Sequence, residues 1–567
     1  MTDPDRGRDA LLVLAVFAAA LAARAAPLYW SPLPATLDGF NYAGLARATL
    51  ETGAFPWNAG VLAADEVGFT AVLSTASAVT GVEPLSLAQP LIAVVGAAAP
   101  LAGIALARDL APASWSPRRV RVAAALVGFG LALEGLFLRR TGVPDEEAVG
   151  LLLVPLLALV AGRWLAGGRR AWGGLTLLLL VVLPPLHNLS SLLGLLTVSG
   201  LVALHAVRGT GGGLRRVAAL AAGAWVYVFG YFLLTARVGL VTSYGQLFEP
   251  YLGLFLAWVV LMAFAVVWVG GADPRGQRAA FLAPVGLGVL LVAVNAVVPL
   301  FPGTVPTLSP VALGVAALLV PVGLAAVGLP AVRRAGGPAV LALFAAPAAL
   351  SYYALTASLT PPFFDAVVRI QSFAHVPVFV LAGVGAAGLL ADRRDGSVSG
   401  SDVGDGFGRA LGAALVAALL VAVVATVPLG YVNLDTGTYP STTLESEFGA
   451  TAFATDRVEG RYATDHTLAR VDTHYLSGPT PGLGVTPTGE ARVAPTRSWL
   501  AGGTPPGCPT LTQRSWTTTG AHLYPAPPGT VPPDAYRSWL SARHVVYRAS
   551  GLDPLVLSVP RRSGGGC

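Results

Sequence analysis

The chain contains 567 residues, of which 54% are apolar and only 12% are charged, and its mean hydropathy is +0.67. These values exclude an ordinary soluble globular protein. Every basic residue is an arginine, which indicates a GC-rich, prokaryotic genome. The net charge of +6 gives no evidence for a nucleic-acid partner, because the arginines are distributed as a membrane topology requires.

Apolar stretches of 16 to 22 residues recur between residues 9 and 430 and then stop. Stretches of this length are typical of transmembrane helices. The first one has no clear cleavage site and further stretches follow it, so we expect a retained anchor and not a signal peptide. Thirteen spans are expected, at residues 9–29, 87–107, 121–138, 148–163, 172–186, 189–206, 218–236, 252–270, 280–299, 309–330, 338–356, 374–391 and 410–430.

One further apolar stretch, residues 67–82, is ambiguous because it is short for a span. If it crosses the bilayer, the basic loop 114–121 lies outside, and if it is re-entrant or interfacial, that loop lies inside. The positive-inside rule favours the second arrangement, in which every inner loop from residue 108 onward carries at least two arginines. We therefore expect a multi-pass plasma-membrane protein with a cytoplasmic N-terminus, a long outer loop at residues 30–86 and an extracytoplasmic C-terminal region.

The region after residue 430 is more polar and rich in Pro, Gly and Thr, which indicates a second domain. Its apolar patterns predict helices at 441–456 and 466–476 and strands at 461–465, 542–549 and 554–559. The stretch 477–533 is expected to be mostly loop. The predicted fold class is therefore mainly α, with a polytopic helical membrane domain at 1–430 and a small extracytoplasmic α/β domain at 431–567.

The C-terminal region carries no recognisable metal or redox motif. Cys508 and Cys567 can pair only if this region faces an oxidising exterior, and Cys567 ends a glycine-rich terminus. The histidines of this region match no metal-binding spacing either.

Two acidic clusters fall on loops that are expected to be outside. Asp38 lies in the first loop together with Asp65 and Glu66, and the short loop RRTGVPDEEAVG occupies residues 139–150. Burying an ionisable side chain in the bilayer costs free energy, so such residues are expected to be functional by default. Four residues of this kind are expected near membrane depth, which are Arg24, His187, Arg369 and His375. The alternative is that the loop acids are merely solvated and that the arginines snorkel to the headgroups. For Asp38 the functional interpretation is favoured, because it directly follows the first span.

The segment LDGFNYAGLARATLETGAFP, residues 37–56, places an acid after the first span and follows it with a helical pattern, a Gly and a Pro. This order resembles the GT-C superfamily of membrane glycosyltransferases, with Asp38 at the acidic position and Tyr42 at a frequent aromatic one. PDEEAVGLLLVPL, residues 144–156, resembles the second acidic motif of that superfamily. Arg369 resembles the basic residue that meets the donor phosphate in some members.

The superfamily includes the oligosaccharyltransferases, the protein mannosyltransferases and the aminoarabinose transferases of lipid A. Thirteen spans followed by an outer domain are most similar to the oligosaccharyltransferase branch. The WWDYG-type motif of that branch and the HPP-type stretch of the mannosyltransferases are absent from this sequence. The resemblance therefore does not specify transfer to Asn sequons.

The resemblance implies transfer of a sugar from a polyprenyl-phosphate-linked donor to an acceptor at the outer face of the membrane. It implies as catalytic residues Asp38, acting as a general base, and Glu146 and Glu147. The residues implied in substrate binding are Tyr42, Asp65, Glu66, Arg139, Arg140, His187, Arg237 and Arg369. In an alternative role, Asp38 and Asp145 hold Mg²⁺ or Mn²⁺ through their hard oxygen atoms. The implied partners are the lipid-linked donor and membrane lipids, with no nucleic acid and no specified protein.

Three other functions remain open at this point. A transporter or flippase of lipid-linked saccharides predicts internal repeats and charges in mid-membrane, of which Glu134 is the main candidate. A polymerase or ligase of surface polysaccharide shares the lipid-phosphate substrate but usually has a large central outer loop. A non-catalytic relative retains the fold without the reaction.

Overall fold

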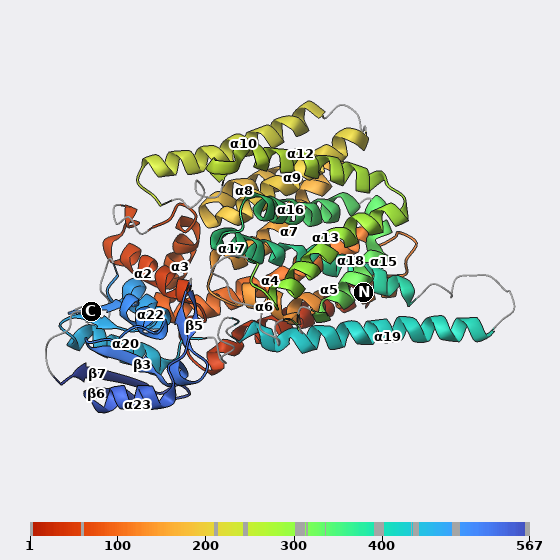
Figure 1. The fold of residues 1–567 in the computed structure, drawn as a ribbon. Coiled ribbons are helices and arrows are strands. Elements are labelled where there is room, and N and C mark those ends of the chain that lie inside the picture. The colour runs from red at the N-terminus through yellow and green to blue at the C-terminus, as the bar shows by residue number, and fades with distance from the viewer. Residues whose placement is uncertain are drawn as a thin grey trace.

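The structure, a computed structural model, describes residues 4–57, 62–208, 214–241, 248–300, 312, 314, 316–334, 336–390, 402–432, 434, 442–478, 488–524, 526–561 and 567. Figure 1 shows a body of long helices with a smaller domain of helices and strands at one end, built from the C-terminal residues. Within the described residues, ten helices are long and apolar enough to cross a bilayer, or eleven if one bent pair is counted as a span. The chain is a multi-pass membrane protein.

A helix occupies each of the thirteen predicted spans. They are α1 (Pro4–Ala25), α4 (Pro84–Leu110), the bent pair α5 (Pro117–Leu133) and α6 (Gly135–Thr141), α7 (Glu146–Gly167), α8 (Arg170–Leu186), α9 (Asn188–Arg208), α10 (Leu214–Arg237), α12 (Leu252–Gly271), α13 (Pro274–Asn295), α15 (Leu319–Gly328), α16 (Gly337–Ala357), α18 (His375–Leu389) and α19 (Asp402–Thr426). The predicted count is higher than ten or eleven because α8 and α15 are only 17 and 10 residues long. Part of the predicted span 309–330 lies outside the described residues.

The first long loop folds into two helices, α2 (Leu37–Thr52) and α3 (Val67–Thr80). The ambiguous stretch 67–82 is thus a helix of 14 residues, shorter than the about 20 residues that a bilayer requires. It contacts α2, α4 and α8. In Figure 1, α2 and α3 lie at the end of the helical body that carries the C-terminal domain.

Two buried charges inside the helical body are satisfied by local partners. Arg24 is fully buried and donates to Thr141 Oγ1 and to the carbonyls of Ala20 and Ala132. Glu134 accepts from two backbone amides at the start of α6, and its Oε2 lies 2.7 Å from His375 Nδ1. Both residues therefore stabilise the bend between α5 and α6, and Glu134 supplies no free charge of the kind that a transporter would use.

The C-terminal domain is an α/β unit with a five-stranded sheet. Its elements are α20 (Glu445–Arg457), β1 (Gly460–Ala463), α21 (His466–Val471) continued by a π-helical turn (Asp472–Leu476), β2 (Gly489–Arg492), α22 (Ala494–Leu500), β3 (Thr510–Gln513), β4 (Ala521–Leu523), β5 (Ala526–Gly529), α23 (Pro533–Ser541), β6 (Arg543–Ala549) and β7 (Leu555–Pro560). The strand order is β2-β1-β3-β7-β6, with β1 parallel to β2 and β3, and β7 antiparallel to β3 and β6.

The five elements predicted in this domain are found near their predicted positions. The stretch 477–533, expected to be mostly loop, also contains five short elements, which are β2, α22, β3, β4 and β5. These elements are only three to seven residues long, which is too short for a clear hydrophobic period. A disulfide joins Cys508, just before β3, to the last residue, Cys567.

Candidate active site

Asp38 lies on α2, a helix that is held in place by packing on two of its faces. It lies in the first turn of the helix, where the positive end of the helix dipole favours an acid. One face of α2, including Phe40 and Ala43, packs against Val471 and Tyr475 of the C-terminal domain. The other face packs against the membrane helices, in a separate apolar cluster. Asp38 is therefore held where the two domains meet.

The second acidic cluster forms the start of α7. Asp145 caps this helix, accepting from the backbone amide of Glu147 at 2.9 Å, and Glu146 and Glu147 occupy the first turn. Glu146 accepts a hydrogen bond from the hydroxyl of Tyr42 and lies 3.9 Å from Nε2 of buried His187. The loop acids thus line up at the positive end of a second helix dipole, close to α2.

Four arginines surround these acids. Arg470, from α21, lies 3.2 Å from Asp38 Oδ1, and Arg140 lies 3.7 Å from Glu147 Oε2. The two others are Arg369, which lies 3.2 Å from Asp365, and Arg139, which donates to the carbonyl of Val432 at 2.6 Å. The cations thus come from three separate parts of the chain.

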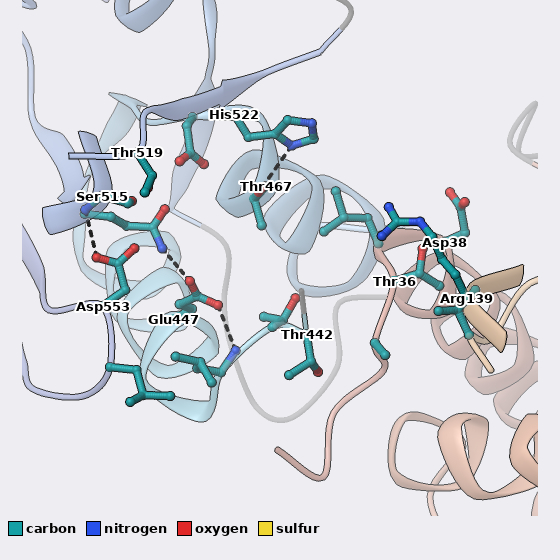
Figure 2. Close-up of a pocket in the computed structure, with 18 of the residues that line it drawn as sticks. Thr36, Asp38, Arg139, Thr442, Glu447, Thr467, Ser515, Thr519, His522 and Asp553 are labelled. Carbon is teal, nitrogen blue, oxygen red and sulfur yellow. Dashed lines mark hydrogen bonds between the residues drawn. The ribbon is translucent and has the colours of Figure 1, made fainter. Parts of the chain in front are cut away.

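A cavity of about 630 Å³ lies between the helical body and the C-terminal domain. This volume lies in the range of ~300–1,000 Å³ typical of small-molecule sites. Figure 2 shows Asp38 and Arg139 on one side and residues of the C-terminal domain, including Glu447, Thr467 and His522, on the other. The helical body contributes to the lining Ala35, Thr36, Leu37, Asp38, Arg139, Arg140, Val143, Asp145, Arg369 and Gly430.

The environment of Asp38 favours its protonated form more than water does. Burial raises the pKa of Asp38, the neighbouring charge of Asp145 raises it further, and Arg369 and Arg470 oppose both effects. The side chain still keeps 38% of its surface exposed, toward the cavity. A carboxylate with a raised pKa beside a cavity is the usual character of a general base.

Asp65 and Glu66 lie behind α2 and do not line the cavity. Burial raises the pKa of Asp65, and it raises the pKa of Glu66 to about 7. Glu66 accepts from Asn41 Nδ2 at 3.1 Å and from the backbone amide of Ala63 at 2.9 Å. These contacts of Glu66 hold the loop before α3 against α2, the helix that carries Asp38.

The structure thus brings some of the predicted site residues to the cavity and leaves others outside it. Asp38, Arg139, Arg140, Asp145 and Arg369 line it. Four others contact or support these residues without lining it; they are Tyr42, Glu146, Glu147 and His187. Arg237 is exposed at the end of α10 and does not line the cavity.

Sequence reasoning missed the wall that the C-terminal domain contributes, and Arg470 with it. The stretch 466–476 was assigned only as a helix, and nothing in its spacing indicates which residue faces α2. Arg470 and Asp38 are 432 residues apart, so only the docking of the two domains brings them together.

The predicted metal role of Asp38 and Asp145 meets a chemical difficulty. Arg470 already pairs with Asp38, and Asp145 already caps α7. Within the part of the chain that the structure describes, no group of three or more His, Cys, Asp or Glu side chains is placed to hold a metal ion. These residues alone therefore do not fit a metal held by protein ligands, and the mechanism proposed below uses none.

No protein-family profile and no curated protein matches the chain. Its fold is similar to that of the Archaeoglobus fulgidus oligosaccharyltransferase in the apo form, with a TM-score of 0.49 and 13% identity over 81% of this chain and 62% of that one. The archaeal oligosaccharyltransferase AglB from A. fulgidus, in complex with an inhibitory peptide and a dolichol-phosphate, gives a TM-score of 0.47 and 14% identity over 81% and 63%. The chain thus corresponds to less than two thirds of the length of these proteins.

ArnT from Cupriavidus metallidurans in the apo state is matched along 98% of both chains, with a TM-score of 0.39 and 12% identity. At these identities the likeness concerns the fold alone.

Proposed function

We propose that the chain is a membrane glycosyltransferase that moves a sugar from a polyprenyl-phosphate-linked donor to an acceptor at the outer face of the membrane. The observation that carries the proposal is the cavity that Asp38 lines together with Arg139, Arg140 and Arg369. It combines an acid able to act as a base with cations able to receive a leaving phosphate.

In this mechanism Asp38 accepts the proton of an acceptor hydroxyl as that oxygen attacks the anomeric carbon. The bond from this carbon to the phosphate oxygen breaks, and its electron pair leaves with the polyprenyl phosphate. The guanidinium groups of Arg369, Arg139 and Arg140 stabilise the charge that develops on this oxygen. The charge of Asp145 raises the pKa of Asp38, whereas the charge of Arg470 lowers it.

The charges and the disulfide support a site at the outer face of the membrane. Arg121, paired with Asp5 at 2.8 Å, and Arg163, paired with Asp109 at 2.8 Å, lie near the helix ends that are expected to be cytoplasmic. Disulfides persist in oxidising compartments, so the Cys508–Cys567 bond supports an extracytoplasmic C-terminal domain. Because this domain packs on α2, the proposal assigns the cavity to the same side.

The test is a transfer assay with the full chain in lipid nanodiscs, with radiolabelled polyprenyl-phosphate mannose and polyprenyl-phosphate glucose as donors and a membrane extract of the host as acceptor source. Asp38→Asn is expected to lower the transfer rate at least about 100-fold, the lower end of the effect of a general base. Glu51→Gln is the matched control, because Glu51 is an exposed acid of the same helix. Equal transfer by wild type and Asp38→Asn, or an unchanged glycan profile of the host carrying that variant, would contradict the proposal.

A further inference from the structure

The two walls of the cavity differ in chemistry. The helical body contributes three arginines to the lining, whereas the C-terminal domain contributes mainly hydroxyl, amide and carboxyl groups, together with Arg514 and His522. Thr467 and Thr519 are among them, and Asp553 adds a carboxyl group (Figure 2). Gln513 lines the same wall. An anionic group fits the first wall, while the second offers many neutral donors and acceptors.

Thr442 provides the most specific sign of a ligand. Its side chain is 95% buried, since its relative exposure is 5%, and its hydroxyl has no hydrogen-bond partner. The residue nevertheless lines the cavity, and Figure 2 shows it between Glu447 and the region of Asp38. A buried hydroxyl without a partner is unfavourable unless a ligand or a water satisfies it.

Glu447 and Gln513 form a neutral pair in the same wall. Glu447 accepts from the backbone amide of Leu444 at 2.7 Å and from Gln513 Nε2. Burial raises the pKa of Glu447 to about 8, which favours the protonated form of its carboxyl. Amide, hydroxyl and neutral carboxyl groups each offer a donor together with an acceptor, which matches the hydroxyl groups of a sugar.

We propose that the C-terminal wall binds a neutral saccharide as the acceptor, with Thr442 at the boundary between acceptor and donor. This assignment rests on the function proposed above. The hydroxyl of the saccharide that faces Asp38 forms the new bond to the anomeric carbon of the donor, gives its proton to Asp38, and releases the polyprenyl phosphate toward the arginines. A phosphorylated acceptor would instead meet the carboxyl groups of Asp465 and Asp553, against the single arginine of this wall, Arg514.

The test measures binding separately from transfer. Saturation-transfer NMR on the full chain in nanodiscs would use four neutral disaccharides, which are mannobiose, maltose, cellobiose and lactose, an octapeptide with an Asn-Ala-Thr sequon, and soluble glycerophosphate. Binding of at least one disaccharide is expected. Thr442→Val keeps the shape of the side chain and is expected to weaken this binding about threefold to tenfold, as one neutral hydrogen bond is lost.

Thr496→Val is the matched control. Thr496 is fully buried in α22, its hydroxyl also lacks a partner, and it does not line the cavity. Neither Thr442→Val nor Thr496→Val removes a hydrogen bond within the protein, so both variants are expected to fold. Thr519→Val adds a substitution at a second, exposed position of the same wall. Asp38→Asn is expected to retain disaccharide binding, so loss of the reaction and loss of the acceptor site are distinguished.

Four results would overturn the proposal. These are binding of the peptide or glycerophosphate in preference to every disaccharide, binding of no disaccharide at millimolar concentration, equal effects of Thr442→Val and Thr496→Val, and unchanged binding in the Thr442→Val Thr519→Val double variant. If disaccharide binding depends on Thr442 but no variant alters transfer, the binding site stands and the proposed transferase function fails.

Discussion

Arg470 of α21 lies 3.2 Å from Asp38 of α2, across the boundary between the C-terminal domain and the helical body. The same boundary is held by Tyr475, whose hydroxyl donates to Glu83 at 2.7 Å and whose ring lies under Arg47, with 4.2 Å between the guanidinium and the ring centroid. The candidate base therefore has its complete environment only when the C-terminal domain is docked. This dependence leads to the first two predictions.

Arg470→Gln is expected to move the acid limb of the pH–activity profile to higher pH. The positive charge of Arg470 lowers the pKa of Asp38, so its removal raises that pKa, and a higher pH is then needed to deprotonate the base. The measurement is the pH dependence of kcat/KM for transfer. Arg457→Gln is the control, because Arg457 is an exposed arginine of the same domain. An unchanged profile for Arg470→Gln would argue against Asp38 as the base.

Gly44→Ala is expected to displace the C-terminal domain and to lower transfer. A Cβ at Gly44 in α2 would lie 2.7 Å from the carbonyl oxygen of His474, a backbone atom that cannot move alone. Gly449 of α20 has open space around it, so Gly449→Ala is expected to stabilise the protein by about 0.5–1 kcal/mol. The measurements are transfer activity and Tm of both variants. Full activity of Gly44→Ala would show that the tight contact in α2 is unimportant for the site.

The helical body could be predicted from the sequence because each span has its own apolar signal and each inner loop carries its arginines. Asp38 and Asp145 could be named because an acid at the start of a helix after an apolar run is visible locally. Thr442, Glu447 and Arg470 could not, because their role depends on how two domains meet. A threonine or an arginine in a polar domain carries no local sign of the cavity that it lines.

The same reasoning explains why only some of the predicted arginines line the cavity. Arg139, Arg140 and Arg237 are equivalent in sequence, since each ends an expected span at the outer side. Only the packing of α6 against the start of α7 brings the first two to the cavity, whereas α10 ends away from it. Positive charge at the end of a span therefore does not by itself indicate whether a residue lines the site.

Glu447→Gln is expected to raise stability at high pH and to change it little at low pH. The pKa of Glu447 is raised to about 8 in the folded protein, so its contribution to stability is fully present below its unfolded value and is lost as pH rises through 8. Glutamine cannot ionise and can still accept from the amide of Leu444. The measurement is Tm of the full chain between pH 5 and pH 9.

Glu445→Gln is the control for that experiment, because Glu445 is an exposed residue in the same helical turn. Its Tm curve is expected to run parallel to that of the wild type. A parallel curve for Glu447→Gln as well would mean that the buried carboxyl does not ionise in this range. The neutral character assigned to the acceptor wall would then need another basis.

Cys567→Ser is expected to lower the free energy of unfolding by about 2–4 kcal/mol, the usual contribution of a disulfide that closes a long loop. The bond spans 59 residues and ties Cys567 to the segment before β3. This segment lies next to the buried guanidinium of Arg543, which donates to the carbonyls of Pro506 and Cys508.

The same bond tests which side of the membrane the C-terminal domain occupies. Free thiols are first blocked by alkylation in cells, and the protein is then denatured and treated with a maleimide-polyethylene glycol. Wild-type protein is expected to react only after reduction of the disulfide. In unblocked, denatured protein, Cys567→Ser is expected to show one reactive thiol without reductant. Two reactive thiols in the unreduced wild type would put the C-terminal domain in a reducing compartment and would remove the extracytoplasmic assignment of the cavity.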